Sequence, residues 1–157
     1  MKTGNTPAPA VLDKNGIQTL IPHSGRMCLL DSVSAWDAVS IECVAVSHRA
    51  ADNPLRSADM LPVQAGIEYA AQAMAVHGGL SAPADGGPRR GYLAVLTDIR
   101  WSVARLDDVP APLRVRARKQ TAIAGGSCYD FTVSEGERVL VAGTAVVALE
   151  AGAGGDA

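Results

Sequence analysis

The sequence predicts an α+β domain in which one long helix packs on an antiparallel sheet. A single long helical pattern, "LPVQAGIEYAAQAMAVHGG", occupies residues 61–79. The remainder of the chain alternates like consecutive antiparallel strands. A chain of 157 residues can form one domain with its own core and is too short for two ordinary domains. The consecutive strand patterns lie at 92–103, 111–124, 128–135 and 138–150.

The domain is predicted to span residues 16–150. The stretch before it, 1–15, contains "TGNTPAPA", and the stretch after it, 151–157, reads "AGAGGDA". Such Gly-, Ala- and Pro-rich ends are typical of flexible tails. The sequence shows neither the apolar core of a signal peptide nor a run of about 18 apolar residues. We therefore expect a cytoplasmic protein that is neither secreted nor membrane-bound.

Between residues 39 and 91 the sequence predicts a strand, a loop, the long helix and a second loop. The segment 39–47, "VSIECVAVS", predicts a strand that is buried on much of both faces. Residues 48–60 are dense in Asp, Asn, Pro and Ser and predict a loop. The helix is expected to begin near Pro62, which suits a first helical turn, and to end at the glycine pair 78–79. The segment 81–91 predicts another loop.

The charge distribution argues against a nucleic-acid-binding protein. The formal net charge is −2, and no basic stripe with interleaved aromatic residues is present. The densest basic cluster alternates along one predicted strand, so it is either a solvated face or a docking patch for an acidic partner. Its members are Arg114, Arg116, Arg118 and Lys119.

The three cysteines, Cys28, Cys43 and Cys128, lack the spacing of a zinc site and are an odd number. They are expected to be small buried hydrophobic residues in a reducing compartment. The sequence contains no P-loop and no GxGxxG motif after a strand. It therefore predicts neither a bound metal nor a nucleotide cofactor.

The predicted helix is built largely of small residues. Gly66 lies in its interior, where glycine costs about 1 kcal/mol relative to alanine and therefore predicts close packing against the sheet. Gln64, Glu68 and Gln72 share one stripe of the helix. That stripe is either a solvated face, or part of a buried helix whose carboxylate has a partner or a task.

Two segments resemble the hotdog-fold 3-hydroxyacyl-acyl-carrier-protein dehydratases. Residues 21–33, "IPHSGRMCLLDSV", are similar to that family's "LPHRxPFLLVDRV", with the histidine, the paired apolar residues and the aspartate in register. Residues 61–72, "LPVQAGIEYAAQ", are similar to "MPGVxxxEAxAQ", in which the glutamate is catalytic. Here Glu68 follows Pro62 at the family's interval, and so does Gln72. The chain is most similar to a divergent dehydratase-like subfamily, some of whose members are associated with aryl-polyene-type biosynthesis.

The resemblance implies a hotdog fold, which is one long central helix wrapped by a curved antiparallel β-sheet. One residue of the family's active site is missing. The catalytic histidine of the family precedes the proline by eight residues, and in this chain that position is Pro54. Val63 also replaces the family's glycine. The usual pair of histidine and glutamate is therefore broken.

The chemistry of the family needs a base to remove a proton alpha to the thioester carbonyl, an acid to expel the hydroxyl, and donors to polarise the carbonyl oxygen. The resemblance implies that Glu68 is the acid or base, with a pKa that burial would raise. Gln72 would orient it. Pro62 and Val63 would stand at the helix N-terminus, where the N–H of Val63 could hold the carbonyl oxygen.

Three histidines are candidates for the missing imidazole. His23 is the first, because its segment lies near the active-site tunnel in related hotdog proteins, and His48 at the end of a strand is the second. His77 is more simply a cation at the helix C-terminus. Each of them could also be an ordinary surface or hydrogen-bonding residue. Asp52 and Asn53, beside the vacated position, could bind a water or the substrate hydroxyl, or could form a turn.

Three functions remain open. The first is a 3-hydroxyacyl-ACP dehydratase, the second is a non-catalytic subunit that pairs with an active homologue, and the third is a hotdog thioesterase in which Glu68 activates water. The expected partner is an acyl carrier protein or a CoA thioester, whose phosphopantetheine arm belongs to the substrate. Because a lone protomer would expose an edge strand, we expect a homodimer, a higher homo-oligomer or a heterodimer with a related dehydratase.

Overall fold

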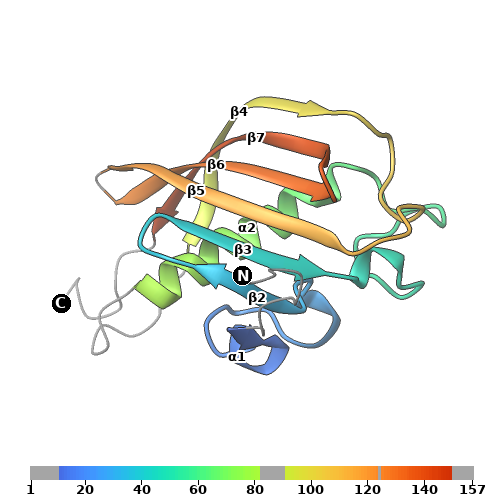
Figure 1. The fold of residues 1–157 in the computed structure, drawn as a ribbon, viewed down its shortest axis with the longest axis horizontal. Coiled ribbons are helices and arrows are strands. Elements are labelled where there is room, and N and C mark those ends of the chain that lie inside the picture. Colours follow the sequence, from blue (N-terminus) through green and yellow to red (C-terminus); the bar gives the residue numbers. More distant parts are fainter. Residues whose placement is uncertain (1–10, 82–90, 124, 150–157) are drawn as a thin grey trace, which may run out of the picture.

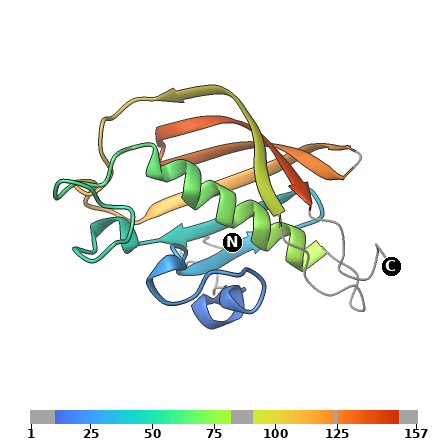
Figure 2. The same cartoon turned by 180° about the vertical axis from the view of Figure 1, so that it is seen from behind.

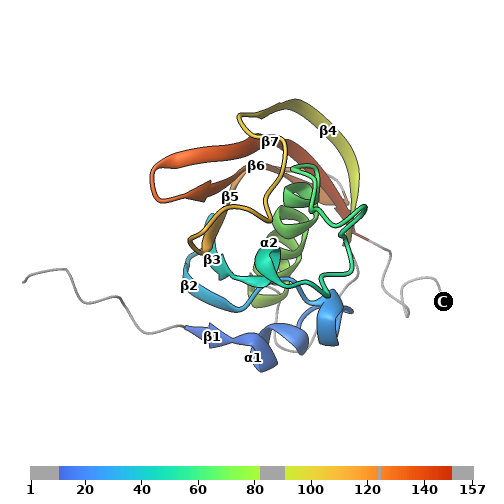
Figure 3. The ribbon, with the colours of Figure 1, turned by 90° about the vertical axis from the view of Figure 1, so that its right-hand side faces the viewer.

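The computed structural model describes residues 11–81, 91–123 and 125–149. Within these ranges, one sheet of seven antiparallel strands curls around the helix α2 (Ala65–Ser81), as Figure 1 and the end-on view in Figure 3 show. The predicted α+β class is therefore confirmed. None of the helices in these ranges is long and apolar enough to cross a membrane.

The strand order across the sheet is β1-β2-β3-β5-β6-β7-β4, so β1 and β4 form the two edges. The helix α1 (Lys14–Gln18) and the short 3-10 turns η1 (Gly25–Met27) and η2 (Ser47–Arg49) lie outside the sheet. The strands are β1 (Leu12–Asp13), β2 (Ser32–Trp36), β3 (Ser40–Ala45), β4 (Gly91–Trp101), β5 (Leu113–Ile123), β6 (Gly126–Glu135) and β7 (Arg138–Leu149).

The strands predicted from the sequence are present, with two differences. β3 alternates strictly between buried and half-buried residues, so it is buried on one face and not on much of both. The reason is that α2 covers only the concave face of the sheet (Figure 2). β2 was not predicted, because its five residues include two serines and do not form a clear apolar alternation.

The folded domain begins earlier than predicted. β1 and the first residues of α1 lie inside the stretch 1–15 that we expected to be a tail, and Asp13 caps α1 by accepting a hydrogen bond from the N–H of Gly16 at 2.9 Å. The start of that tail, the C-terminal tail 151–157 and most of the loop at 81–91 lie outside the described residues.

The basic cluster on β5 is a solvated face. Arg114, Arg116 and Arg118 are exposed, and Lys119 is half-buried. Glu42 of the neighbouring strand β3 forms ion pairs with Arg114 at 3.2 Å and with Arg116 at 3.0 Å. Cross-strand pairs of this kind on an exposed face contribute little to stability.

The hydrophobic core lies between α2 and the concave face of the sheet. All of the small residues on the inner side of α2 are covered, and large apolar side chains from the strands and loops fill the remaining space. The cysteines Cys28 and Cys43 are buried there as free thiols, whereas Cys128 is half-buried. The largest fully buried side chains include Tyr69, Phe131, Leu30, Leu61, Leu106, Leu113 and Leu140.

Gly66 lies on the side of α2 that packs against the sheet. A Cβ atom at this position would lie 2.7 Å from Cγ1 of Val141 on β7, and within 4 Å of Val133 and Leu106. Real Cβ atoms do not approach a neighbour that closely, so glycine is needed for the observed distance between helix and sheet. The packing role predicted for Gly66 is therefore confirmed.

Gly66→Ala is expected to lower the free energy of unfolding by about 1 to 2 kcal/mol, because overpacking outweighs the gain in helix propensity. Gly78→Ala is the matched control. It lies on the same helix, and a Cβ there would meet no atom within 4 Å. This control should raise stability by up to about 1 kcal/mol. Urea denaturation of both variants checks the prediction, and a Gly66→Ala protein as stable as the Gly78→Ala protein would contradict it.

Candidate functional site

Glu68 lies in the first turn of α2 and is exposed to solvent. Of the two alternatives left open for its stripe, the single chain therefore has the solvated face at Glu68. The sheet covers the opposite side of the helix, and the outer stripe continues from Glu68 through the half-buried Ala71 and Ala75 to the exposed Gly78. Glu68 forms no hydrogen bond or ion pair with any other residue that the structure describes. On this side of α2 it is therefore a carboxylate surrounded by small residues.

Gln72 does not orient Glu68. It is buried, its Oε1 accepts a hydrogen bond from the N–H of Leu29 at 2.8 Å, and its Nε2 donates to the carbonyl of Met27 at 2.7 Å. The side chain therefore fastens α2 to the segment that runs from η1 to β2. The prediction placed Gln72 on the same stripe as Glu68, whereas the position four residues later is turned by about 40° toward the protein.

The N-terminus of α2 differs from the prediction in a way that affects the oxyanion site. The helix begins at Ala65 rather than at Pro62, which is half-buried and whose carbonyl accepts the N–H of Ala65 at 2.9 Å. The N–H of Val63 donates to the carbonyl of Ala104 at 3.0 Å, so it is not free to hold a thioester oxygen. Among the described residues, the backbone N–H of Gln64 has no hydrogen-bond partner, whereas the N–H groups of Val63, Ala65 and Gly66 each have one.

His48 is unsuited to act as the missing base. It is fully buried, and its Nε2 hydrogen-bonds to the carbonyl of Val109 at 3.1 Å. A carbonyl only accepts, so Nε2 carries the proton, and burial lowers the pKa of the imidazole. The prediction of His48 as a substrate-binding residue is therefore not supported by its position under the connection between β4 and β5.

His23 is half-buried in the segment between α1 and η1. Its Nδ1 is buried and has no hydrogen-bond partner among the described residues. No contact joins His23 to Glu68 within this part of the chain. The structure therefore does not bring the two predicted catalytic residues together within one protomer.

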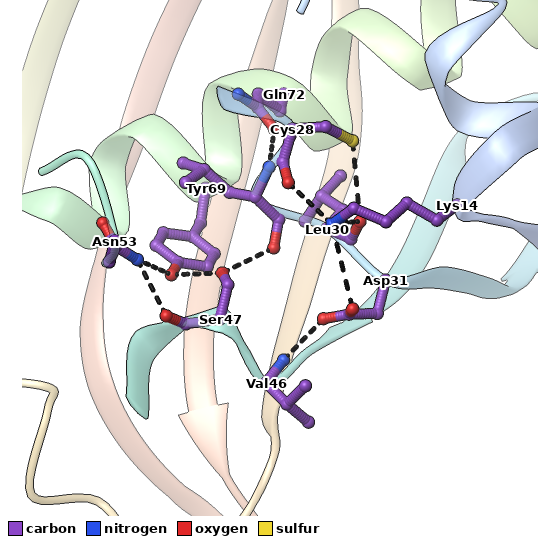
Figure 4. A network of polar contacts seen from close by, with 10 residues as sticks. Lys14, Cys28, Leu30, Asp31, Val46, Ser47, Asn53, Tyr69 and Gln72 are labelled. Atoms are coloured by element: carbon purple, nitrogen blue, oxygen red, sulfur yellow. Dashed lines mark hydrogen bonds and ion pairs between the residues drawn. The ribbon is translucent and has the colours of Figure 1, made fainter. Parts of the chain in front are cut away.

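Asn53 is a structural residue rather than an open ligand for substrate. It is buried, its Oδ1 accepts the N–H of Leu55 at 2.8 Å, and its Nδ2 donates to the carbonyl of Ser47 at 2.8 Å and to the hydroxyl of Tyr69 at 3.0 Å (Figure 4). The adjacent Asp52 is exposed. The contacts of Asn53 agree with the turn interpretation of this segment, and both ends of its amide are engaged within the protomer.

Figure 4 also shows a residue that the sequence reasoning missed. The hydroxyl of Tyr69, directly after Glu68 on α2, lies 2.7 Å from the hydroxyl of Ser47. Ser47 in turn donates to the carbonyl of Leu29 at 2.8 Å. The sequence contained one signal, which is a tyrosine in a helix built largely of small residues. A tyrosine that such a helix buries needs a hydrogen-bond partner for its hydroxyl.

A cavity of about 340 Å³ lies beside the position of the vacated histidine. Pro54, Asn53 and Ala50 form one wall, and Lys14 and Arg26 contribute cationic groups. None of the lining residues is a histidine or a glutamate. Asp52 is the one carboxylate in the lining, so within the described residues this cavity has neither the histidine nor the glutamate of the family's active site.

His77 is not a surface cation at the end of α2. It is fully buried, its Nε2 lies 2.8 Å from the carbonyl of Asp37, and its Nδ1 lies 2.7 Å from the hydroxyl of Tyr129. The carbonyl fixes the proton on Nε2, so the tyrosine hydroxyl donates to Nδ1. Burial lowers the pKa of His77 and favours the neutral ring.

The two buried histidines predict that stability falls in mild acid. Because burial lowers the pKa of His48 and of His77, the unfolded chain binds protons below about pH 6.5 that the folded chain does not. Their contribution is therefore complete above that pH and decreases as the pH falls, by at most about 1.4 kcal/mol per pH unit for each ring.

Urea denaturation between pH 7.5 and 5.0 checks this prediction, because the ordinary pKa values of carboxyl groups lie below this pH range. His77→Gln should reduce the slope of stability against pH, because the glutamine does not titrate. A wild-type protein that is equally stable at both ends of the window would contradict the assignment of two neutral buried rings.

The strand β4 leaves one edge of the sheet open. It pairs with β7 alone and contacts α2. Val95, Leu96 and Trp101 on this strand are 49%, 40% and 54% exposed. Val95 and Leu96 follow one another, so apolar side chains are exposed on both faces of an unpaired edge. Such an edge is suited to pairing with another chain.

Comparisons with known proteins agree with this geometry. The chain resembles the dehydratase heterocomplex ApeI:P from Xenorhabdus doucetiae, with a TM-score of 0.73 and 21% identity over 85% of this chain and 90% of that chain. It also resembles a point mutant of the thioesterase PA1618 from Pseudomonas aeruginosa, with a TM-score of 0.63 and 12% identity over 92% of this chain and 98% of that chain. These likenesses confirm the hotdog fold. No curated protein sequence matches the chain significantly.

A match between the sequence and a family model shows the family of the chain. The profile of the ApeP-like family, described as ApeP dehydratase, matches residues 15–151. That range includes both segments in which the resemblance was recognised, the whole of α2 and every strand from β2 to β7. The chain belongs to the ApeP-like dehydratase family.

Proposed function

We propose that this protein is one subunit of a heterodimeric 3-hydroxyacyl-ACP dehydratase in fatty-acid- or polyene-type biosynthesis. Glu68 is the carboxylate that this chain contributes, and a related hotdog dehydratase contributes the histidine. The substrate is a thioester on the phosphopantetheine arm of an acyl carrier protein. We place the reaction in the cytoplasm.

One observation carries the proposal. Glu68 is exposed on α2, and no acid or base in the described part of the chain lies within hydrogen-bonding reach of it. The position that holds the histidine in related dehydratases is Pro54. We infer that a second chain supplies the other half of the site, and the name of the structure from Xenorhabdus doucetiae, a dehydratase heterocomplex, supports a partner of this kind.

The chemistry divides between the two chains. The partner's imidazole removes the proton alpha to the thioester carbonyl, and the carboxyl group of Glu68 gives a proton to the departing hydroxyl, which leaves as water. The N–H of Gln64, the residue before α2, has no partner among the described residues and is a suitable donor to the carbonyl oxygen as negative charge develops there. Coverage by the partner would remove Glu68 from solvent, which favours the protonated carboxyl that this role requires.

The test is turnover of 3-hydroxyhexanoyl acyl carrier protein by this chain alone, by a histidine-bearing hotdog homologue from the same organism alone, and by the two mixed. We expect enoyl product from the mixture and much less from this chain alone. A mixture with no more activity than the sum of its parts would reject the proposal. Release of free thiol on the carrier protein is followed in the same reactions, and it would favour the thioesterase alternative that the neighbour PA1618 represents.

A further inference from the structure

We infer that Tyr69 is a positioning residue that fixes the turn of α2 carrying Glu68. Its hydrogen-bonded hydroxyl holds the helix to the loop after β3 and so sets the place of the neighbouring carboxylate in the composite site. This inference rests on the proposed function, because it requires Glu68 to act on the substrate. It concerns a residue whose side chain is itself fully buried in the protomer.

The donor and the acceptor of each hydrogen bond around Tyr69 can be assigned without ambiguity. The carbonyl of Leu29 can only accept, so the hydroxyl of Ser47 donates to it. Ser47 must therefore accept from the hydroxyl of Tyr69, which in turn accepts from the amide of Asn53. Every hydroxyl in this chain of hydrogen bonds has both a donor and an acceptor (Figure 4), so no member can turn away without leaving a buried polar group unpaired.

The anchors of this part of α2 are turned from Glu68 toward the protein, by about 100° for Tyr69 and about 40° for Gln72. On the outer stripe, the neighbours of Glu68 are Gln64, Ala71 and Ala75, and the two alanines are too small to restrain it. On the inner side, Tyr69 reaches the 47–53 loop and Gln72 reaches the segment 27–29. Two polar anchors on different segments fix both the rotation of the helix and its position along its axis.

The far end of α2 provides a matched control. There the hydroxyl of Tyr129 donates to His77, which is also fully buried on the helix. Nine residues separate Glu68 from His77, or about 13 Å along the axis. Loss of the Tyr69 hydroxyl removes two hydrogen bonds and loss of the Tyr129 hydroxyl removes one, and only Tyr69 lies beside Glu68.

The test measures kcat and KM of the heterodimer with 3-hydroxyhexanoyl acyl carrier protein for the wild type, Tyr69→Phe and Tyr129→Phe. Both variants are expected to melt a few degrees lower. Only Tyr69→Phe should lower kcat, by about tenfold, with KM changed by less than about twofold, because a small displacement of a catalytic group affects the reacting geometry more than binding. Ser47→Ala removes the acceptor of the Tyr69 hydroxyl and should lower kcat in the same way.

The outcomes separate the inference from the proposed function. If the wild-type heterodimer is active and Tyr69→Phe and Ser47→Ala both keep its kcat per folded heterodimer, the inference is overturned while the proposed function stands. If Tyr129→Phe lowers kcat as much as Tyr69→Phe, the effect is a general loss of stability and the inference is also overturned. If the wild-type heterodimer has no activity, the proposed function itself fails.

Discussion

Glu68→Gln is expected to reduce kcat of the heterodimer by about 10² to 10⁴-fold. The glutamine keeps the size of the side chain and can still hydrogen-bond, but it cannot exchange a proton in the pH range of the reaction, and a well-placed general acid contributes about that factor. Because Glu68 is exposed in the single chain, the substitution should leave the stability of the protomer within about 0.5 kcal/mol of the wild type.

The control for this prediction is Glu137→Gln, an exposed carboxylate in the turn between β6 and β7. It changes the net charge by the same amount away from α2 and should leave kcat unchanged. Enoyl product formed from 3-hydroxyhexanoyl acyl carrier protein is the measurement for both variants. A Glu68→Gln heterodimer with kcat close to that of Glu137→Gln would contradict the assigned role.

Leu96→Glu on β4 is expected to weaken the heterodimer by at least about 100-fold in Kd. Leu96 is 40% exposed at the unpaired edge of the sheet, where pairing with a second chain would bury it. A carboxylate placed in an apolar interface without a partner loses its hydration and gains nothing in return. In the isolated chain the same side chain remains in water, so folding should be retained.

Val139→Glu is the control for the interface. Val139 is 45% exposed, but it lies on β7 next to the turn with β6 rather than on the edge strand. Sedimentation analysis of each variant mixed with the partner should show dissociation for Leu96→Glu alone. Equal association of the two variants would show that β4 is not the interface.

The parts of the fold that could be predicted are those with a strong local pattern. The first half of β5, residues 113–118, alternates clearly between buried and exposed residues, and Gly66 correctly identified the side of α2 that packs on the sheet. β2 could not be predicted, because five residues with two serines carry too weak a pattern. The helix start was misplaced because Val63 uses its N–H for a tertiary bond to Ala104, which has no local signature.

The site was harder to predict than the fold. The motif identified Glu68, but a helix with small residues nearly all round does not reveal which stripe faces solvent. The contacts of Gln72 and Asn53 could not be predicted because their partners include backbone groups brought close only by folding, such as the carbonyl of Met27 for Gln72. Tyr69 was overlooked for the same reason, since its partners Ser47 and Asn53 belong to another element.

The central claim is that the active site is shared between two chains, and complementation of half-sites tests it most directly. In one mixture, this chain as the wild type is combined with a partner whose own helix carboxylate is replaced by glutamine but whose histidine is kept. In the other, Glu68→Gln is combined with the wild-type partner. The account predicts turnover in the first mixture and loss of it in the second. Activity in the second mixture, with none in the first, would show that the partner's own carboxylate acts and that Glu68 does not.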